Sequence, residues 1–175
     1  MSALVVVESY FGNTRHIADI VAESLSSVGI QTEVVPVEDA PTELRAGIDL
    51  LVVGAPTHDS GLSTGETRQA ACARSGHLVP GIGVREWVGR VVSPTAPPLV
   101  ALFDTRTGRP WLPGSAAAQA SVLLSHKGFP ILPARATFRV QDITGPLAIG
   151  EEEHARRWAN VVAARVERRR LSQHR

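Results

Sequence analysis

The strongest constraint on the fold is the alternation of short, continuously apolar runs with longer segments of helical periodicity. Residues 4–7 (LVVV) and 49–54 (DLLVVG) are rich in valine and leucine without polar alternation, which is typical of strands buried on both faces of a sheet. Between them, residues 15–28 repeat apolar side chains at helical spacing, and Gly29 follows as a helix-ending glycine. Strands that alternate with helices predict an α/β domain with a parallel sheet and helices on both faces.

The same pattern assigns elements along the whole chain. Strands are expected at residues 4–7, 32–37, 49–54 and 98–103 and within residues 129–140. Helices are expected at residues 15–28, 65–74, 84–91 and 115–127 and from about residue 151, with a short helix or turn at residues 39–46. Pro133 interrupts the last strand, which predicts an irregular strand or one at an edge of the sheet.

Length, charge and cysteine content limit the class of protein. At 175 residues the chain suffices for one well-buried core, so we expect one domain over residues 1–167 and a basic, frayed tail over residues 168–175. The formal net charge of +1 gives no global attraction to nucleic acid or an anionic membrane. Cys72 is the single cysteine, which excludes an intramolecular disulfide, fits a reducing compartment and indicates a small buried helix residue. Without a signal peptide or an apolar stretch of roughly 20 residues, we expect a cytoplasmic protein with no membrane insertion.

In a parallel α/β sheet, ligands bind beyond the carboxyl ends of the strands, where the strand order reverses. The loop at residues 8–14 follows the first strand and leads straight into a helix, whose N-terminus presents unpaired N–H groups. Ser9 and Thr14 add hydroxyl donors, while Gly12 and Asn13 tolerate the tight turn that wraps an anion. The loop favours phosphate binding, although an ordinary capped strand-to-helix turn would show the same residues.

The pattern Ser9-x-Phe11-Gly12-Asn13-Thr14 resembles the phosphate loop of flavodoxins, Thr/Ser-x-Thr/Ser-Gly-Asn-Thr. The resemblance implies a flavodoxin-like three-layer α/β sandwich, with a five-stranded parallel sheet in the order 2-1-3-4-5 and helices on both faces. It also implies one non-covalent FMN, whose phosphate is held by hydroxyls and backbone amides without a metal or a lysine.

Phe11 departs from this family pattern. It stands where flavodoxins usually have a hydroxyl residue, so one phosphate hydrogen bond is lost or comes from the backbone. The absence of GxxxxGK argues against a P-loop nucleotide site. A narrower resemblance is to actinobacterial flavodoxin-domain proteins with ESxxGNTR, GxPTH and FDTR segments.

The loops after the third and fourth strands resemble the two flavodoxin loops that flank the isoalloxazine ring. In residues 54–61 (GAPTHDSG), His58 falls at the ring-facing position, where it contacts the flavin or is a solvated loop histidine; proton donation by His58 is a hypothesis. In the later loop, Trp111 stacks on the ring or covers the loop, whereas the other two tryptophans lie on apolar helical stripes. Asp104 accepts a hydrogen bond from the pyrimidine N3–H or caps the turn, and Arg106 stabilises a reduced flavin or is solvated.

The candidate cofactor-binding residues are therefore Ser9, Tyr10, Phe11, Gly12, Asn13, Thr14, Pro56, Thr57, His58, Gly61, Asp104, Thr105, Arg106 and Trp111. No catalytic residue or metal ligand is predicted.

Three functions remain open at this stage. The first is FMN-dependent electron transfer, as a carrier for a redox partner protein or as a reductase of a small acceptor such as a quinone. The near-neutral charge departs from the strongly acidic flavodoxins and favours the small acceptor. The second is a flavodoxin-like binding or regulatory module that has lost FMN, and the third is a flavin enzyme acting on a porphyrin precursor. The oligomeric state is left open.

Overall fold

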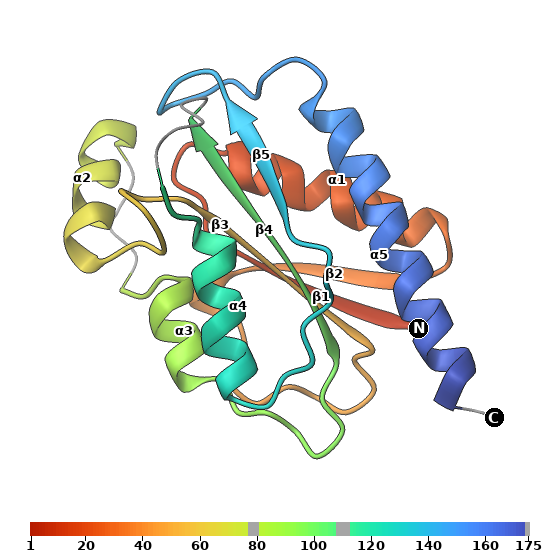
Figure 1. The fold of residues 1–175 in the computed structure, drawn as a ribbon. Coiled ribbons are helices and arrows are strands. Elements are labelled where there is room, and N and C mark those ends of the chain that lie inside the picture. Colours follow the sequence, from red (N-terminus) through yellow and green to blue (C-terminus); the bar gives the residue numbers. More distant parts are fainter. Residues whose placement is uncertain (77–80, 108–112, 174–175) are drawn as a thin grey trace.

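The computed structural model of this chain describes residues 1–76, 81–107 and 113–173. Five strands form one sheet: β1 Ser2–Val7, β2 Gln31–Pro36, β3 Leu50–Pro56, β4 Leu99–Thr107 and β5 Ala136–Val140. Their order is β2-β1-β3-β4-β5 and every pair of neighbours is parallel (Figure 1). The predicted architecture and strand order are confirmed, and β5 lies at the expected edge.

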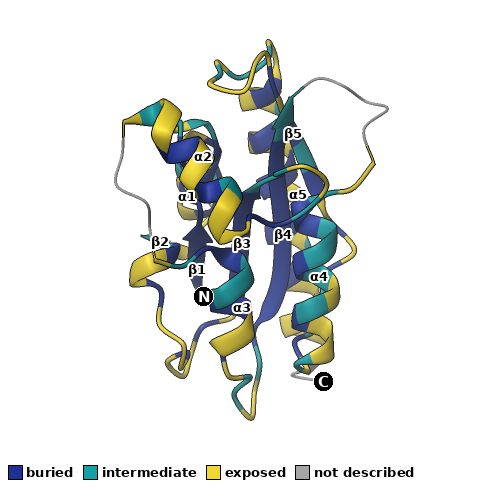
Figure 2. Cartoon of the chain, turned by 90° about the vertical axis from the view of Figure 1, so that its left-hand side faces the viewer, coloured by how far each residue is buried: buried dark blue, intermediate teal, exposed yellow. Residues whose placement is uncertain are grey.

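The helices of the described chain are α1 Asn13–Ser27, α2 Gly65–Ser75, α3 Val84–Arg90, α4 Ala116–His126 and α5 Glu151–Gln173, with a 3₁₀ turn, η1, at Val37–Asp39. The sheet separates two apolar cores. One is built with α1 and α5, and the other with α3 and α4. Figure 2 shows that the buried residues concentrate in the strands and on the helix faces turned toward them. This two-sided burial explains why the central strands are continuously apolar.

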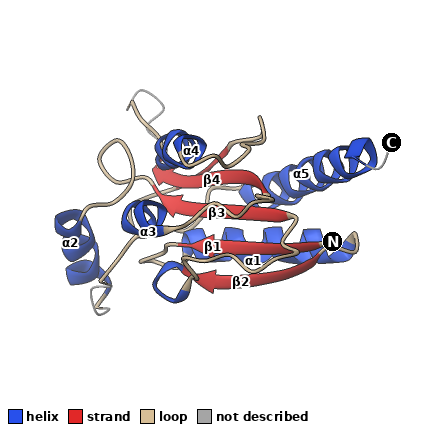
Figure 3. Cartoon of the chain, turned by 90° about the horizontal axis from the view of Figure 1, so that it is seen from below, coloured by secondary structure: helices blue, strands red, loops and turns tan. Residues whose placement is uncertain are grey.

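α2 belongs to neither helical layer. In Figures 1 and 3 it lies beyond the carboxyl ends of the strands, beside the edge where a ligand binds in such sheets. Its Ala71 and Cys72 pack against Tyr10 and Phe11 in a small apolar cluster separate from both cores. Cys72 is buried, as predicted.

The two helical tryptophans are core residues, as their spacing predicted. Trp87 on α3 is fully buried and donates its indole N–H to the Pro41 carbonyl at 3.1 Å. Trp158 on α5 is 7% exposed and donates to the Ala134 carbonyl. Each therefore buries its ring and still satisfies its polar N–H.

Residues 39–46, predicted as a short helix or turn, are not helical beyond the 3₁₀ turn that ends at Asp39, and Glu43 forms a bridge with Val92. Two predicted boundaries were wrong. β4 continues to Thr107 because its last residues pair with β5, a partner too distant in sequence to be anticipated. α5 extends to Gln173, so most of the expected frayed tail is helical; no glycine or proline interrupts this helix. In the described part of the chain, no helix is both long and apolar enough to cross a membrane.

Candidate functional site

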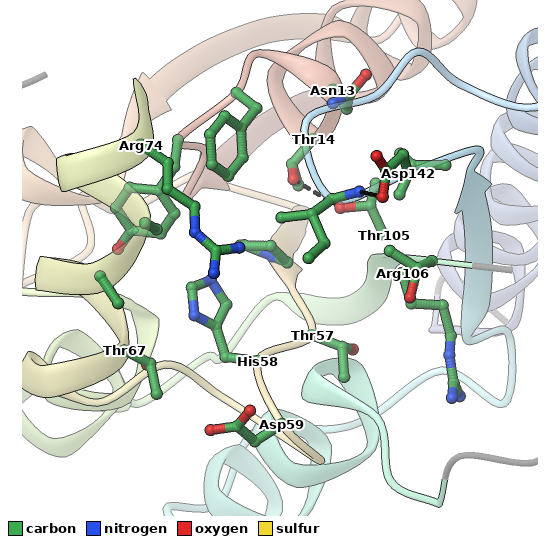
Figure 4. Close-up of a pocket in the computed structure, with 18 of the residues that line it drawn as sticks. Asn13, Thr14, Thr57, His58, Asp59, Thr67, Arg74, Thr105, Arg106 and Asp142 are labelled. Carbon is green, nitrogen blue, oxygen red and sulfur yellow. Dashed lines mark hydrogen bonds between the residues drawn. The ribbon is translucent and has the colours of Figure 1, made fainter. Parts of the chain in front are cut away.

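A cavity of about 1030 Å³ lies at the carboxyl edge of the sheet. Its walls come from the loops after β1, β3 and β4, from one side of α2 and from residues 140–143 at the end of β5 (Figure 4). The volume lies at the upper end of the range for small-molecule sites. The cavity includes the β1/β3 boundary, where the strand order reverses. The three loops expected from the sequence do meet around one cavity.

The loop between β1 and α1 is built to present backbone donors. Gly12 is the residue before α1 and has a left-handed backbone with φ 83°, which an L-residue rarely adopts. Among the described residues, no acceptor binds the backbone N–H groups of residues 10–14. Ser9 Oγ accepts a hydrogen bond from Arg15 N at 3.3 Å, which leaves the Ser9 hydroxyl hydrogen free to donate. These donors surround the positive end of the α1 dipole.

Two contacts hold this loop in place from elsewhere in the chain. Thr14 Oγ1 lies 2.7 Å from Thr105 Oγ1, and both side chains are buried. The pair shares one hydrogen, so the other hydroxyl hydrogen can donate to a ligand. Asn13 Nδ2 donates to the Thr144 carbonyl at 3.1 Å, and a Cβ on Gly145 would come within 2.5 Å of Asn13 Oδ1. The loop after β5 thus closes directly on the loop between β1 and α1, which the sequence did not indicate.

Tyr10 and Phe11 line the cavity and also have structural roles. The Tyr10 hydroxyl donates to Glu8 Oε1 at 2.6 Å, while Val84 N donates to Glu8 Oε2 at 2.6 Å. Burial, together with the adjacent Glu8 carboxylate, raises the pKa of Tyr10 far above its ordinary value. The ring of Phe11 packs next to α2 and also lines the cavity. Contact with α2 therefore explains a phenylalanine where flavodoxins have a hydroxyl residue.

A buried ion pair fixes α2 to the body of the protein. Arg68 on α2 is 4% exposed and donates to both carboxylate oxygens of Glu86 on α3, at 3.0 and 3.1 Å. Arg68 also donates to Ser63 Oγ at 3.2 Å. Burial alone would raise the pKa of Glu86, but the Gly83 N–H and the Arg68 guanidinium outweigh it and lower that pKa. Glu86 is therefore a stable anion that holds Arg68, and with it α2, in one position.

The loop after β3 forms a tight turn in which His58 N donates to Gly61 O and Gly61 N donates to His58 O, both at 2.9 Å. The His58 ring lies edge-on to Tyr10, with 5.4 Å between ring centroids. Burial lowers the pKa of His58, outweighing the neighbouring Glu8 and Asp59 carboxylates. A neutral imidazole at pH 7 weakens the hypothesis that His58 is a proton donor. Gly61 faces α4 instead of the cavity, because a Cβ there would collide with Gln119 Oε1.

Asp104, which lies within β4, is fully buried and does not line the cavity. Its Oδ2 accepts hydrogen bonds from Thr57 Oγ1 at 3.0 Å, Ser115 Oγ at 2.5 Å and Ala117 N at 3.2 Å. The structure favours the alternative that Asp104 caps the turn into α4. Arg106 lines the cavity and donates to the Gly114 carbonyl at 3.1 Å, and Gly114 in turn lies against the backbone of Ser60. The two loops that follow β3 and β4 are thereby in contact.

The structure brings most predicted site residues together. Nine of them line the cavity: Tyr10, Phe11, Asn13, Thr14, Pro56, Thr57, His58, Thr105 and Arg106. Ser9, Gly12, Gly61 and Asp104 shape the loops from outside the lining. The predicted role of Trp111 falls outside the described residues. The sequence missed the wall that α2 contributes, including Arg74; helical periodicity predicted the helix but gave no signal for where it docks.

Comparison with known proteins identifies the fold. No family model matches this chain, and no curated protein matches it. Among solved structures, oxidised flavodoxin 2 from Bacillus cereus has a TM-score of 0.67 and 18% identity over 97% of this chain and 99% of that chain. The flavodoxin of Streptococcus pneumoniae TIGR4 has a TM-score of 0.66 and 15% identity over 94% and 99%.

This chain has a flavodoxin-like fold. An archaeal flavodoxin gives the same result, with a TM-score of 0.64 and 15% identity over 95% of this chain and 99% of that chain. At these sequence identities, the similarity to flavodoxins shows the fold alone. The narrower actinobacterial resemblance finds no support in these structures.

Proposed function

We propose that this flavodoxin-like protein binds one FMN non-covalently and uses it for electron transfer. The observation that carries the proposal is the loop at residues 10–14, whose backbone N–H groups have no acceptor among the described residues. This loop stands at the N-terminus of α1 and opens onto a cavity of about 1030 Å³. Convergent N–H groups at a helix N-terminus favour a phosphate, and the cavity accommodates the rest of such a ligand.

The residues present fit FMN. The phosphate would accept hydrogen bonds from residues 10–14, from the Ser9 hydroxyl and from the Thr14–Thr105 pair. The ring system would lie between the loops that follow β3 and β4. When bound, FMN supplies the redox chemistry. The chain supplies fixed donors, and the αL conformation of Gly12 keeps them converged before the ligand arrives.

Phe11 does not argue for a flavin-free module. Its backbone N–H is one of the free donors, and its side chain has a packing partner in α2. The loss of one hydroxyl therefore leaves the phosphate site otherwise intact. Between the two electron-transfer roles, the formal net charge of +1 favours a reductase of a small acceptor over a carrier that docks by an acidic surface.

The test compares FMN with riboflavin, which lacks the phosphate. Purified protein is mixed with either flavin, freed of excess by gel filtration and examined for visible flavin absorbance. We expect FMN to remain bound and to bind at least about 100-fold more tightly than riboflavin, since two charge-assisted hydrogen bonds are worth about 3 kcal/mol or more. A protein that stays colourless with FMN, or that binds both flavins equally, would show that the loop is not a flavin phosphate site.

A further inference from the structure

α2 gives the cavity a second end, opposite the loop after β5. The helix stands outside both helical layers and beyond the strand ends (Figures 1 and 3). Two contacts described above hold it there, the apolar cluster with Tyr10 and Phe11 and the buried Arg68–Glu86 ion pair. Its inner side lines the cavity from Thr64 to Arg74. The wall is therefore a fixed part of the fold.

Arg74 places a cation at this end. Figure 4 shows its side chain extending from the last turn of α2 into the cavity, toward His58. Within the described parts of the chain, its guanidinium has no hydrogen-bond or ion-pair partner. Glu66 on the same helix is eight residues away, about 12 Å along the axis, too far to neutralise it. Asp59 lies on the exposed tip of its turn, and Asp142 belongs to the opposite wall (Figure 4).

The wall that carries this guanidinium combines apolar groups with the polar side chains of Thr67 and His58. Phe11 faces the cavity from the phosphate loop, and Ala70 and Ala71 face it from α2. A cation bordered by flat and small apolar groups is complementary to an aromatic body that bears one anionic group. A purely apolar ligand would leave the guanidinium without a partner, and a polyanion would meet no second cationic side chain among the described cavity-lining residues of α2.

We propose that the α2 end of the cavity is a binding subsite for a flat aromatic acid, whose carboxylate or sulfonate is bound by Arg74. The ring of the acid lies against Phe11 and the alanines of α2. This inference rests on the proposed function, because it names the chemical class of the small acceptor that the flavin site would serve.

The test measures binding by equilibrium dialysis, with and without FMN. The probes are anthraquinone-2-sulfonate and the uncharged 2-(hydroxymethyl)anthraquinone, which share one ring system. We expect the wild-type protein to prefer the sulfonate, and we expect Arg74→Gln to weaken sulfonate binding about tenfold while leaving the uncharged probe unchanged. Arg74→Lys should retain part of the preference. Arg90→Gln, at the exposed end of α3 and away from the lining, is the matched control and should bind both probes like wild type.

The outcomes separate the two proposals. Sulfonate affinity that is the same in wild type, Arg74→Gln and Arg90→Gln would overturn the subsite, even if FMN binds. An equal loss for both probes in Arg74→Gln would also overturn it, because charge recognition would then be absent. Arg74-dependent sulfonate binding in a protein that never retains FMN would support the subsite and refute the flavin proposal. Weakening of sulfonate binding by added salt is expected of an exposed charge pair.

Discussion

Replacing Gly12 with alanine tests whether the proposed phosphate loop, between β1 and α1, depends on its backbone conformation. Gly12 has φ 83°, and a Cβ there would meet no atom within 4 Å, so the change introduces no clash. A left-handed conformation costs an L-residue roughly 1–2 kcal/mol. Alanine also lowers the conformational entropy of the unfolded chain, which stabilises the folded state by about 0.4–1 kcal/mol. We expect a net loss near 1 kcal/mol in the free energy of unfolding, or about 2–4 °C in Tm.

Gly29 provides the matched control at the other end of α1. It has the same φ of 83° and, again, nothing within 4 Å of a Cβ. Gly12→Ala and Gly29→Ala should therefore lose similar stability. Only Gly12→Ala should change FMN binding, because relief of its strain turns loop N–H groups away from the phosphate. The loss of one charge-assisted hydrogen bond corresponds to a drop in affinity of about tenfold or more.

The assay pairs thermal unfolding of the flavin-free variants with titration of FMN fluorescence. Equal Tm losses with a selective loss of FMN affinity in Gly12→Ala would support the assigned loop. Equal FMN affinity in the two variants, at equal Tm losses, would refute the inference that the αL residue organises the donors. A much larger Tm loss in Gly12→Ala would mean that the substitution also disturbs the packing of neighbouring side chains.

Three further changes test the groups around the cavity. Thr105→Val leaves the buried Thr14 hydroxyl without its partner and should lower the free energy of unfolding by about 1–3 kcal/mol in urea titrations; no change would mean that water replaces the bond. Burial lowers the pKa of His58 in the folded protein below its ordinary 6.5, so the unfolded chain binds a proton at His58 at a higher pH than the folded protein does. The free energy of unfolding should therefore fall as the pH drops from 6.5 toward the folded pKa. His58→Asn should remove that part of the slope, and urea midpoints that fall as steeply as in wild type would contradict the shift. Glu86→Gln removes the carboxylate that pairs with the buried Arg68, so it should cost about 3 kcal/mol in urea unfolding, and a loss under 1 kcal/mol would show that the pair is not what holds α2.

Local sequence pattern was enough to predict the layers of the fold and a tight turn between β1 and α1. The runs in β1 and β3 are buried on both faces, so their composition alone indicates central strands. The loop between β1 and α1 is likewise a local feature: its residues predict a tight turn, which Gly12 makes with a left-handed backbone directly before the helix. Family resemblance added the strand order, which periodicity cannot supply.

The roles of several site residues depend on long-range contacts, which the sequence does not reveal. Asp104 follows an apolar run at the site edge, and only its bonds to Thr57 and Ala117 show that it is an α4 cap. Thr14 and Thr105 are 91 residues apart, so their contact has no sequence signature. The sequence does not distinguish Arg74 from the other arginines. Its position in the cavity follows from where α2 docks.

The charges around the cavity bear on which acceptor the proposed flavin site would suit. Its described lining holds Arg74 and Arg106 together with Asp59, Glu66 and Asp142, so neither sign dominates. Steering of a charged protein partner requires a surface field of one sign, which this rim does not provide. A small ligand instead responds to single groups within contact distance. The mixed rim therefore favours a small molecule selected by one guanidinium over a protein partner selected by a charged surface.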